Sequence, residues 1–492
     1  MSLILAIDQS TSATKAILFD ESGHLIDKAS CEHRQIYPQA GWVEHDPEEI
    51  WKNLRAVVDQ LAQRKRPILD DLIGLSIANQ RETFVVFDRQ TGKPLHNAIV
   101  WQCRRGARIC EELSQQGNDL FVRERTGLKL DTYFPASKIA WLMREKPEIA
   151  AKLHSGEAVI GTIDAFLIHR LTQGSEFATD HTNASRTLLF DVHKLQWDQM
   201  LCDMFGVPMR SLPEVRECDA HFGETDVDGV LNSKVPICGV MGDSQASLFA
   251  QQCYESGTGK ATFGTGTSVM VNVGNRSELS IQGAVLALAW VINKRPTYAL
   301  EGLINYSSAT IAWLKDQLGL IADAAESETL ANQVEDNGGV YLVPAFAGLS
   351  APHWNAEARA AILGMSGHTT KAHIARAALE SISYQIRDVL DMISAESGKK
   401  PKLMQADGGP TRNKFLMQFT ADMTQLAWNV SSVPESSALG AAMAGLLGLG
   451  KVSTLFDLAG LPRENEQYVP QMSQVRADAL HCEWQMAVRR VL

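Results

Sequence analysis

The sequence predicts an α/β protein of two domains, and three observations support this fold class. The chain has 492 residues, which is more than a single hydrophobic core usually organises. In its first part, short apolar segments of strand length alternate with a segment of helical periodicity. The second half begins again with a strand, a small polar turn and a strand. These observations indicate a duplicated architecture with a boundary near residues 245–255, and we expect domains of residues 1–248 and 249–492.

The N-terminal segment is predicted to form three strands joined by short turns. Residues 3–7 are apolar and few, which is typical of a buried central strand. Residues 15–19 and 24–30 continue as the second and third strands. The result is a β-meander whose first turn is rich in hydroxyl groups.

A helix is predicted to follow. Asp46 suits the N-cap and Pro47 the first helical position. Apolar residues then recur on one face of the helix, namely Ile50, Leu54, Val57, Val58 and Leu61. Residues 72–78 form a further buried strand, so strands and helices alternate as in an α/β domain.

The second half repeats the strand, turn and strand arrangement. Residues 261–263 lead into a turn at residues 264–267, and residues 268–273 form the next strand. Residues 438–450 are the most apolar stretch of the chain, but they are fewer than the roughly 20 residues that a membrane span needs. We expect a buried helix there, whose small residues allow close packing.

Charge and cysteine content exclude several classes of protein. The formal net charge of −11 argues against a nucleic-acid partner, which would require clustered Lys and Arg. The eight cysteines are scattered and form no C-x-x-C pair, so neither a zinc site nor a disulfide framework is expected. Reduced thiols and the lack of a signal-peptide pattern predict a cytoplasmic protein without a membrane partner.

The two polar turns have the composition of phosphate-binding loops. In the first turn, Thr11, Ser12 and Lys15 offer donors for phosphate oxygens, and Asp8 could hold Mg²⁺. In the second turn, Gly264 and its neighbours let the backbone approach a ligand closely. Either segment alone also fits a plain polar β-turn.

Charged residues follow two other predicted strands. Asp243 lies between a strand and an apolar helix, where it could be a general base for a substrate hydroxyl or simply an N-cap. Arg81 and Glu82 offer a donor and an acceptor side by side, which suits a polyol, although a local ion pair is the alternative. Two glycines at residues 408–409 would let a flat ring approach the backbone, or they form an ordinary loop before a helix.

Taken together, these segments resemble the FGGY carbohydrate kinase family, and within it the glycerol kinases. The resemblance covers nearly the whole chain and is carried by long motifs in a fixed order. These motifs are residues 35–38, 41–47, 79–83, 97–105, 133–141, 182–187 and 360–380.

The resemblance implies a fold and an activity. The fold would be two actin-like (ribonuclease H-like) ATPase domains with an interdomain catalytic cleft. The activity would be ATP-dependent phosphorylation of a hydroxyl of a small polyol or sugar, with ATP and Mg²⁺ as cofactors. Family members are often dimers or tetramers, so a homo-oligomer is expected.

The resemblance also implies roles for individual residues. Asp243 would be the catalytic base, and Asp8 together with Asp243 would serve Mg²⁺. The acceptor would be surrounded by Arg81, Glu82, Trp101, Tyr133, Asp243, Ser244 and Ser268. The nucleotide would be contacted by Thr11, Ser12, Lys15, Gly264, Thr265, Ser308, Gly409 and Asn413.

Four of these positions depart from the pattern of glycerol kinases. Ser244 replaces a glutamine and Ser268 a phenylalanine on the acceptor side, which leaves more room. Lys15 replaces an arginine and Ser308 a glycine on the nucleotide side. The sequence therefore predicts an acceptor larger or more polar than glycerol. A true glycerol kinase is the main alternative, and an ATP-binding sensor without kinase turnover is a further one.

Overall fold

The computed structural model describes residues 2–275, 283–431, 435–461 and 465–492. The chain forms two compact units, and neither is continuous in sequence. The first contains Met1–Gln252, Leu286–Tyr298 and Glu435–Pro462, and the second contains Cys253–Val285, Ala299–Pro434 and Arg463–Leu492. A single division at residue 248 differs from this partition, because two segments of the C-terminal half pack with the first unit.

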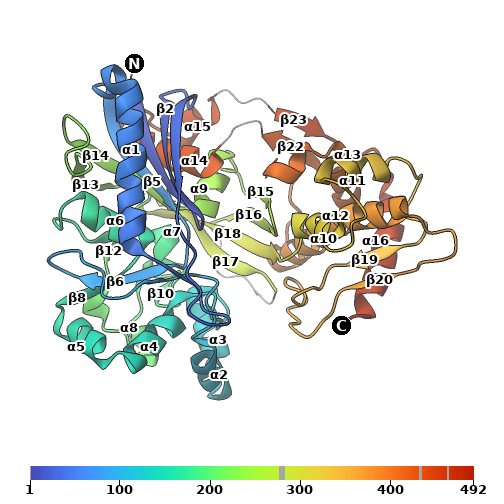
Figure 1. Ribbon diagram of the computed structural model, residues 1–492, viewed down its shortest axis with the longest axis horizontal. Helices are drawn as coiled ribbons and strands as arrows, with labels where there is room; N and C mark the ends of the chain where they lie inside the picture. The colour runs from blue at the N-terminus through green and yellow to red at the C-terminus, as the bar shows by residue number, and fades with distance from the viewer. Residues whose placement is uncertain (1, 276–282, 432–434, 462–464) are drawn as a thin grey trace. The chain divides into compact units, whose positions relative to one another are not determined.

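A six-stranded sheet is the centre of the first unit (Figure 1). Its strands, in spatial order, are β13 (His221–Thr225), β14 (Val235–Gly242), β5 (Leu72–Asn79), β1 (Leu3–Gln9), β2 (Ala13–Asp20) and β3 (Leu25–Glu32). Strands β1, β5 and β14 run parallel, whereas β1, β2 and β3 form the predicted antiparallel meander. The strand predictions for the N-terminal segment are therefore confirmed.

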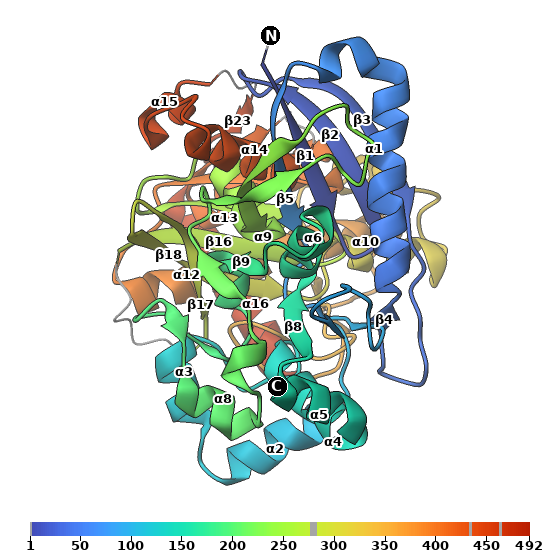
Figure 2. The same ribbon diagram turned by 90° about the vertical axis from the view of Figure 1, so that its left-hand side faces the viewer.

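Helices cover both faces of this sheet (Figure 2). On one face lie α1 (Pro47–Leu69) and α6 (Ile163–Leu171), and on the other lies α14 (Ser436–Gly448) with α9 (Asp243–Ala250) against it. Successive side chains of each strand point to opposite faces of the sheet. Leu5, Ile7 and Ile77 join the α1 and α6 core.

The rest of the first unit is built from smaller elements. A four-stranded sheet contains β4 (Glu44–His45), β7 (Ala98–Ile99), β6 (Phe84–Asp88) and β8 (Ala158–Thr162). Two-stranded pairs are formed by β9 (Ala178–Asp180) with β12 (Glu214–Arg216), and by β10 (Phe190–Asp191) with β11 (Gln196–Trp197). The helices are α2 (Ala107–Gln115), α3 (Asp119–Thr126), α4 (Pro135–Glu145), α5 (Pro147–Ser155), α7 (His181–Ala184), α8 (Gln199–Phe205) and α15 (Leu455–Ala459).

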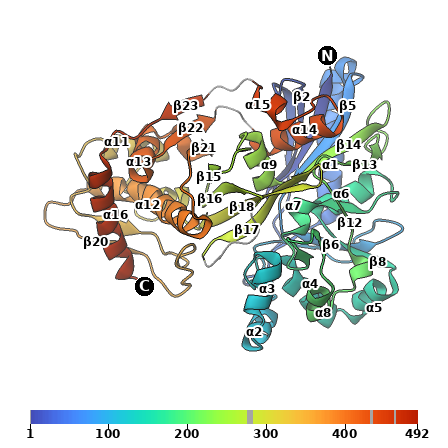
Figure 3. The same cartoon turned by 180° about the vertical axis from the view of Figure 1, so that it is seen from behind.

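A seven-stranded sheet supplies the strands of the second unit (Figure 3), although residues 286–298 of this sheet are counted with the first unit. Its order is β17 (Val285–Ile292), β18 (Arg295–Ile304), β16 (Thr267–Gly274), β15 (Thr258–Phe263), β21 (Leu403–Asp407), β22 (Ala427–Ser431) and β23 (Asn465–Tyr468). Strand β15 pairs antiparallel with β16 and parallel with β21, so a hairpin again adjoins a parallel strand. The plan of the first unit is thus repeated, as predicted.

Helices and one short sheet complete the second unit. They are α10 (Ser308–Asp316), α11 (Ala324–Ala331), α12 (Lys371–Ser397), α13 (Lys414–Thr424) and α16 (Gln474–Arg489), with β19 (Tyr341–Val343) paired to β20 (Ala361–Leu363). Tyr384 of α12, Phe419 of α13 and Trp484 of α16 share one apolar core. Among the residues that the structure describes, no helix combines the length and apolar character needed to cross a bilayer.

The apolar stretch near the C-terminus is the predicted buried helix, and its glycines set how closely it packs. A Cβ added at Gly440 of α14 would lie 1.8 Å from the carbonyl oxygen of Ala246 in α9. One added at Gly445 would lie 2.4 Å from Ser76 Oγ of β5. Because backbone atoms cannot yield as a flexible side chain can, α14 tolerates no larger residue at Gly440.

Gly440→Ala is therefore expected to destabilise the first unit. Overpacking a close contact of this kind costs about 1–3 kcal/mol. Thermal unfolding followed by circular dichroism should show a lower midpoint for this variant. Gly367→Ala is the control, since a Cβ at Gly367 meets nothing within 4 Å. Equal midpoints for both variants would contradict the packing described here.

Candidate active site

The parallel strands of the first unit bring three polar segments to one edge of the sheet. In the register of these strands, Asp8 of β1 lies opposite Ala78 of β5, and Gly242 of β14 lies opposite Asn79. The residues that follow each strand therefore meet at its carboxyl end, where α/β proteins place their ligands. Residues 80–82 and Asp243, which are distant in the sequence, become neighbours there.

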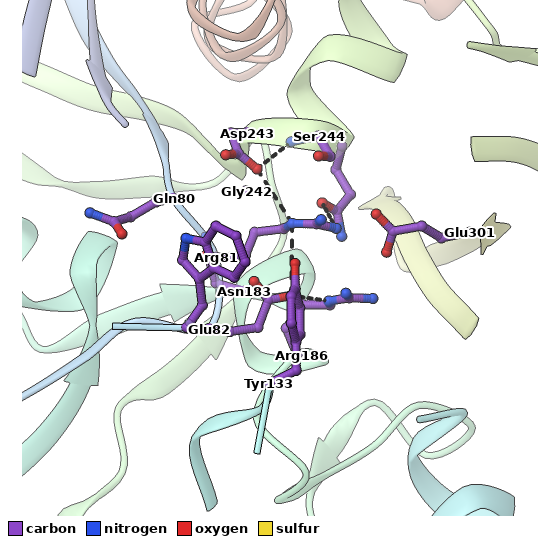
Figure 4. Close-up of polar contacts among 12 residues, drawn as sticks. Gln80, Arg81, Glu82, Tyr133, Asn183, Arg186, Gly242, Asp243, Ser244 and Glu301 are labelled. Atoms are coloured by element: carbon purple, nitrogen blue, oxygen red, sulfur yellow. Dashed lines mark hydrogen bonds and ion pairs between the residues drawn. The ribbon is translucent and has the colours of Figure 1, made fainter. Parts of the chain in front are cut away.

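The Arg81 guanidinium joins these segments (Figure 4). Its Nε lies 3.3 Å from Oδ1 of Asp243 and 3.8 Å from Oε1 of Glu82, and one of its terminal nitrogens donates to Gln245 at 3.3 Å. The Arg81 side chain is only 5% exposed, whereas that of Asp243 is 35% exposed. The Asp243 carboxyl group is thus accessible, and its position is held by the buried Arg81 guanidinium.

Asp243 does not act as an N-cap. The N-cap of α9 is Gly242, and Asp243 is the first helical residue. Its Oδ1 accepts a hydrogen bond from the Ser244 N–H at 2.6 Å. The N-cap alternative is therefore wrong, and one oxygen of the carboxylate is oriented by the start of the helix.

Glu82 occupies a strained and buried position. Its φ is +60°, a value that few non-glycine residues adopt, and its side chain is 2% exposed. Arg186, which is fully buried, donates from Nε to Oε1 of Glu82 at 2.6 Å. Backbone strain of this kind collects at functional sites and persists only where the surroundings enforce it.

A short helix, α7, holds the strand ends in register. Asn183 and Asn79 exchange hydrogen bonds through their side-chain amides, at 2.9 and 3.0 Å. Asp180 caps the helix by accepting from the Asn183 and Thr182 N–H groups, and Thr182 Oγ1 accepts from the Gly242 N–H at 2.8 Å. The ends of β5 and β14 are thus tied to one element, directly beside Asp243.

Two aromatic rings form a wall next to the polar residues. The rings of Trp101 and Tyr133 have centroids 5.3 Å apart. The indole N–H of Trp101 donates to Thr11 Oγ1 at 3.0 Å. This bond connects the wall to the turn between β1 and β2, which also carries Ser12.

Lys15 is engaged in an ion-pair network. Its Nζ lies 2.5 Å from Oε2 of Glu435 and 3.7 Å from Oδ2 of Asp8, and Lys28 reaches the other Glu435 oxygen at 3.0 Å. Burial raises the pKa of Asp8 to about 7, and Lys15 partly opposes this rise. Contact of Lys15 with a phosphate stays a prediction, since its ammonium is held here by two carboxylates.

In the second unit, the turn after β15 is the counterpart of this hairpin. Gly264 N–H donates to the Gly266 carbonyl, and Ser308 bonds through Oγ to the Gly264 carbonyl at 2.7 Å. The start of α10 therefore backs the turn, while Thr265 is exposed. A Cβ at Gly266 would lie 2.3 Å from the Ile304 carbonyl oxygen, so glycine is required there.

The glycine pair that follows β21 lies at the same edge as this turn. A Cβ added at Gly408, which has a φ of +104°, would lie 1.9 Å from the Phe263 carbonyl oxygen at the end of β15. Gly409 has open space around it, and Asn413 caps α13 by accepting from the Leu416 N–H. Gly264 and Gly409 are thus brought to neighbouring strand ends, as nucleotide binding would require.

The partner of Ser268 is a distant residue of a neighbouring strand. Its Oγ donates to Oε1 of Glu301 at 3.1 Å, and Glu301 is buried in β18. Four further residues contact the candidate site, namely Arg186, Asn183, Gln245 and Glu435. Arg186 lies within the motif at residues 182–187, and its charge is complementary to that of Glu82.

The carboxylates of the candidate site suit Mg²⁺ better than a metal ion that is bound by protein side chains alone. In the described ranges, no three His, Cys, Asp or Glu side chains cluster so as to hold a metal ion. Mg²⁺ usually binds through one or two carboxylates together with substrate phosphates and water. Asp8 and Asp243 provide oxygen ligands of this kind, and each lies at a strand end on the same edge of the sheet.

Known proteins match both halves of the chain. Residues 3–250 match the N-terminal domain of the FGGY family of carbohydrate kinases, and residues 259–449 match its C-terminal domain. Glycerol kinase 1 of Thermotoga maritima is 45% identical over 491 residues, covering 99% of each chain.

Two solved structures extend the comparison. The crystal structure of Plasmodium falciparum glycerol kinase with ADP has a TM-score of 0.95 at 37% identity and covers 100% of this chain and 98% of that one. A ligand-bound xylulose kinase from Lactobacillus acidophilus has a TM-score of 0.89 at 21% identity, over 99% and 97% of the two chains, and shares the fold. With these matches over both units, the chain belongs to the FGGY family of carbohydrate kinases and is an ATP-dependent kinase.

Proposed function

We propose that the chain transfers the terminal phosphoryl group of Mg-ATP to a hydroxyl of a small polyol, with Asp243 as the general base. The observation that carries this proposal is the placement of Asp243 against Arg81. A carboxylate that is accessible, close to a buried guanidinium and fixed at a strand end is equipped to take a hydroxyl proton.

The surrounding side chains supply the other requirements of a polyol site. Arg81 donates hydrogen bonds and Glu82 accepts them, so adjacent hydroxyl groups can be held in one orientation. Trp101 and Tyr133 give an apolar wall for the carbon chain. Orientation of this kind converts an encounter of two reactants into a step within one complex.

The nucleotide-binding residues in this proposal come from both hairpins, from the start of α10 and from the segment between β21 and α13. They are Thr11, Ser12, Lys15, Gly264, Thr265, Ser308, Gly409 and Asn413. Bound Mg-ATP supplies the phosphoryl group and the neutralisation of charge during its transfer. Asp8 and Asp243 are the residues that would hold the metal ion.

The acceptor is proposed to be longer or more polar than glycerol. Ser244 and Ser268 are small hydroxyl residues at positions where glycerol kinases carry a glutamine and a phenylalanine. Phosphorylation of glycerol itself is the second candidate, favoured by the 45% identity to a glycerol kinase over the full chain. An ATP-binding sensor is the third candidate, and it differs from both because an acceptor would not stimulate its ADP release.

We also infer a cytoplasmic location, where the eight free cysteines would stay reduced. Association into a homo-oligomer is a further prediction, which light scattering of the purified protein can test.

The first test replaces the base. Asp243→Asn should lower acceptor-stimulated ADP release by about 10²–10⁴-fold, because a positioned general base contributes that much. The nucleotide affinity should remain within about threefold, since the phosphate-binding turns are unchanged. Glu145→Gln, on the exposed end of α4, is the control with unchanged rates. Full activity in the Asp243→Asn variant would remove Asp243 from the mechanism.

The second test compares acceptors. With Mg-ATP, the wild-type protein should release ADP faster with a four- or five-carbon acceptor than with glycerol. The panel is glycerol, erythritol, xylitol, ribitol, xylulose and ribulose. The double substitution Ser244→Gln and Ser268→Phe should move the ratio of kcat/KM values towards glycerol by roughly 10–200-fold, the range that pocket-filling groups supply. A wild-type preference for glycerol over every longer acceptor would establish the glycerol kinase alternative.

The third test concerns the metal. Asp8→Asn should raise the Mg²⁺ concentration for half-maximal rate by about tenfold, because a neutral amide binds Mg²⁺ less well than a carboxylate. Titration of Mg²⁺ at saturating ATP measures this concentration. Asp20→Asn, at the other end of the β1–β2 hairpin, is the matched control. An unaltered Mg²⁺ requirement in Asp8→Asn would exclude Asp8 as a metal ligand.

A further inference from the structure

Lys138 is a buried cation that has no part in the mechanism described above. It lies in α4, and its side chain is fully buried. Burial lowers the pKa of Lys138 to about 7, although the nearby Cys103, Glu82 and Asp131 oppose this decrease. A lysine is seldom fully buried unless its charge is compensated.

The ammonium group of Lys138 is compensated by backbone carbonyls from two separate loops. In one loop it reaches the carbonyl oxygens of Val100 and Trp101, both at 3.3 Å. In the other it reaches those of Thr132 and Tyr133, at 2.7 and 3.1 Å. The two loops are the ones that carry the aromatic wall, since Trp101 belongs to the first and Tyr133 to the second.

Local structure gives no other reason for a lysine at this position. Lys138 lies in the first turns of α4, which begins at Pro135, and a cation near the N-terminus of a helix opposes the helix dipole. Residues that are unfavourable for the secondary structure in which they lie are often found at functional sites. The contacts across the two loops are the compensation that the structure offers.

Other contacts press the first loop against the same helix. Arg105 packs its guanidinium over the rings of Trp42 and Trp141, at 4.2 and 4.9 Å, and pairs with Glu44 at 2.7 Å. A Cβ at Gly106 would lie 2.4 Å from Ser137 Oγ of α4. The loop that ends in Arg105 is thus fixed at its far end, and Lys138 fixes the end that carries Trp101.

We propose that Lys138 is a positioning residue for acceptor binding, which sets the spacing of Trp101 and Tyr133 by binding the carbonyls of both loops. This inference rests on the proposed function of the site. The wall also connects to the β1–β2 turn through the bond from Trp101 to Thr11. Loss of the ammonium group would let the rings of Trp101 and Tyr133 move apart, while Asp243 and Arg81 would stay in place.

The test replaces Lys138 by methionine, which keeps the length of the side chain but removes every donor. With glycerol and xylitol as probes, the acceptor KM of Lys138→Met should rise about tenfold, which corresponds to about 1.4 kcal/mol. The KM for ATP and the kcat at saturating acceptor should each change less than threefold. A purely structural role would lower the amount of active protein but would leave the acceptor KM of the folded fraction unchanged.

The control is Leu142→Ala, which removes a buried apolar side chain from the same helix and leaves the Lys138 ammonium in place. An equal rise in acceptor KM for Leu142→Ala would overturn the proposal, because general loosening of α4 would then suffice. Lys138→Gln keeps one amide donor and should give a smaller rise. It tests the same point if the methionine variant does not fold, and an unchanged acceptor KM in Lys138→Gln would then count against the proposal.

The same experiment separates this inference from the function on which it rests. Absence of acceptor-stimulated ADP release in the wild-type protein would defeat the proposed function itself. Normal wild-type activity with an unaltered Lys138→Met variant would defeat the positioning role alone.

Discussion

The first unit depends on one buried cation, Arg81, held between two carboxylates. Removing a guanidinium and two carboxylates from water is unfavourable unless their geometry satisfies all three groups. Here Asp243 and Glu82 lie within 3.3 and 3.8 Å of the Arg81 Nε, and each has a second donor of its own. The Ser244 N–H orients Asp243, and Arg186 orients Glu82. The ends of β5 and β14 can therefore lie side by side without unpaired charge.

This arrangement explains why the supporting residues are polar as well as buried. Helix α7 ties β5 to β14 through Asn79, Asn183 and Thr182, so the register that brings Asp243 to Arg81 is maintained. The positive φ of Glu82 is tolerated because its carboxylate is bound by Arg186. Charge-assisted hydrogen bonds of this kind restrict the motion of Glu82 and Asp243, and phosphoryl transfer depends on such positioning.

Much of the fold could be predicted from local patterns. The β-meander, the helix after Asp46, the second hairpin and the small-residue helix are confirmed, because each depends on periodicity, capping or turn chemistry within a few residues. The pairing of distant segments could not be predicted in the same way. Residues 286–298 and 435–462 belong to the first unit, although they follow the first strands of the second unit in the sequence. No local sequence pattern predicts that the chain goes back to the first unit.

The same distinction between local patterns and distant contacts applies to the candidate site. Asp243, Arg81 and Glu82 could be proposed because each follows a predicted strand. Their partners could not, since Arg186 meets Glu82 and Glu435 meets Lys15 across 104 and 420 residues of sequence. The role of Lys138 could not be predicted for another reason. Its partners are main-chain carbonyls, and every residue type carries a main-chain carbonyl, so the sequence does not indicate which ones it binds.

The central claim is that Arg81 organises the acceptor site, and direct binding of the acceptor tests it most simply. Calorimetric titration should compare the wild-type protein with Arg81→Met, using the best acceptor of the panel and, separately, ATP. The account predicts that Arg81→Met loses at least about tenfold in acceptor affinity, or about 1.4 kcal/mol, and keeps its affinity for ATP. An Arg81→Met variant that binds the acceptor as tightly as the wild-type protein would contradict it.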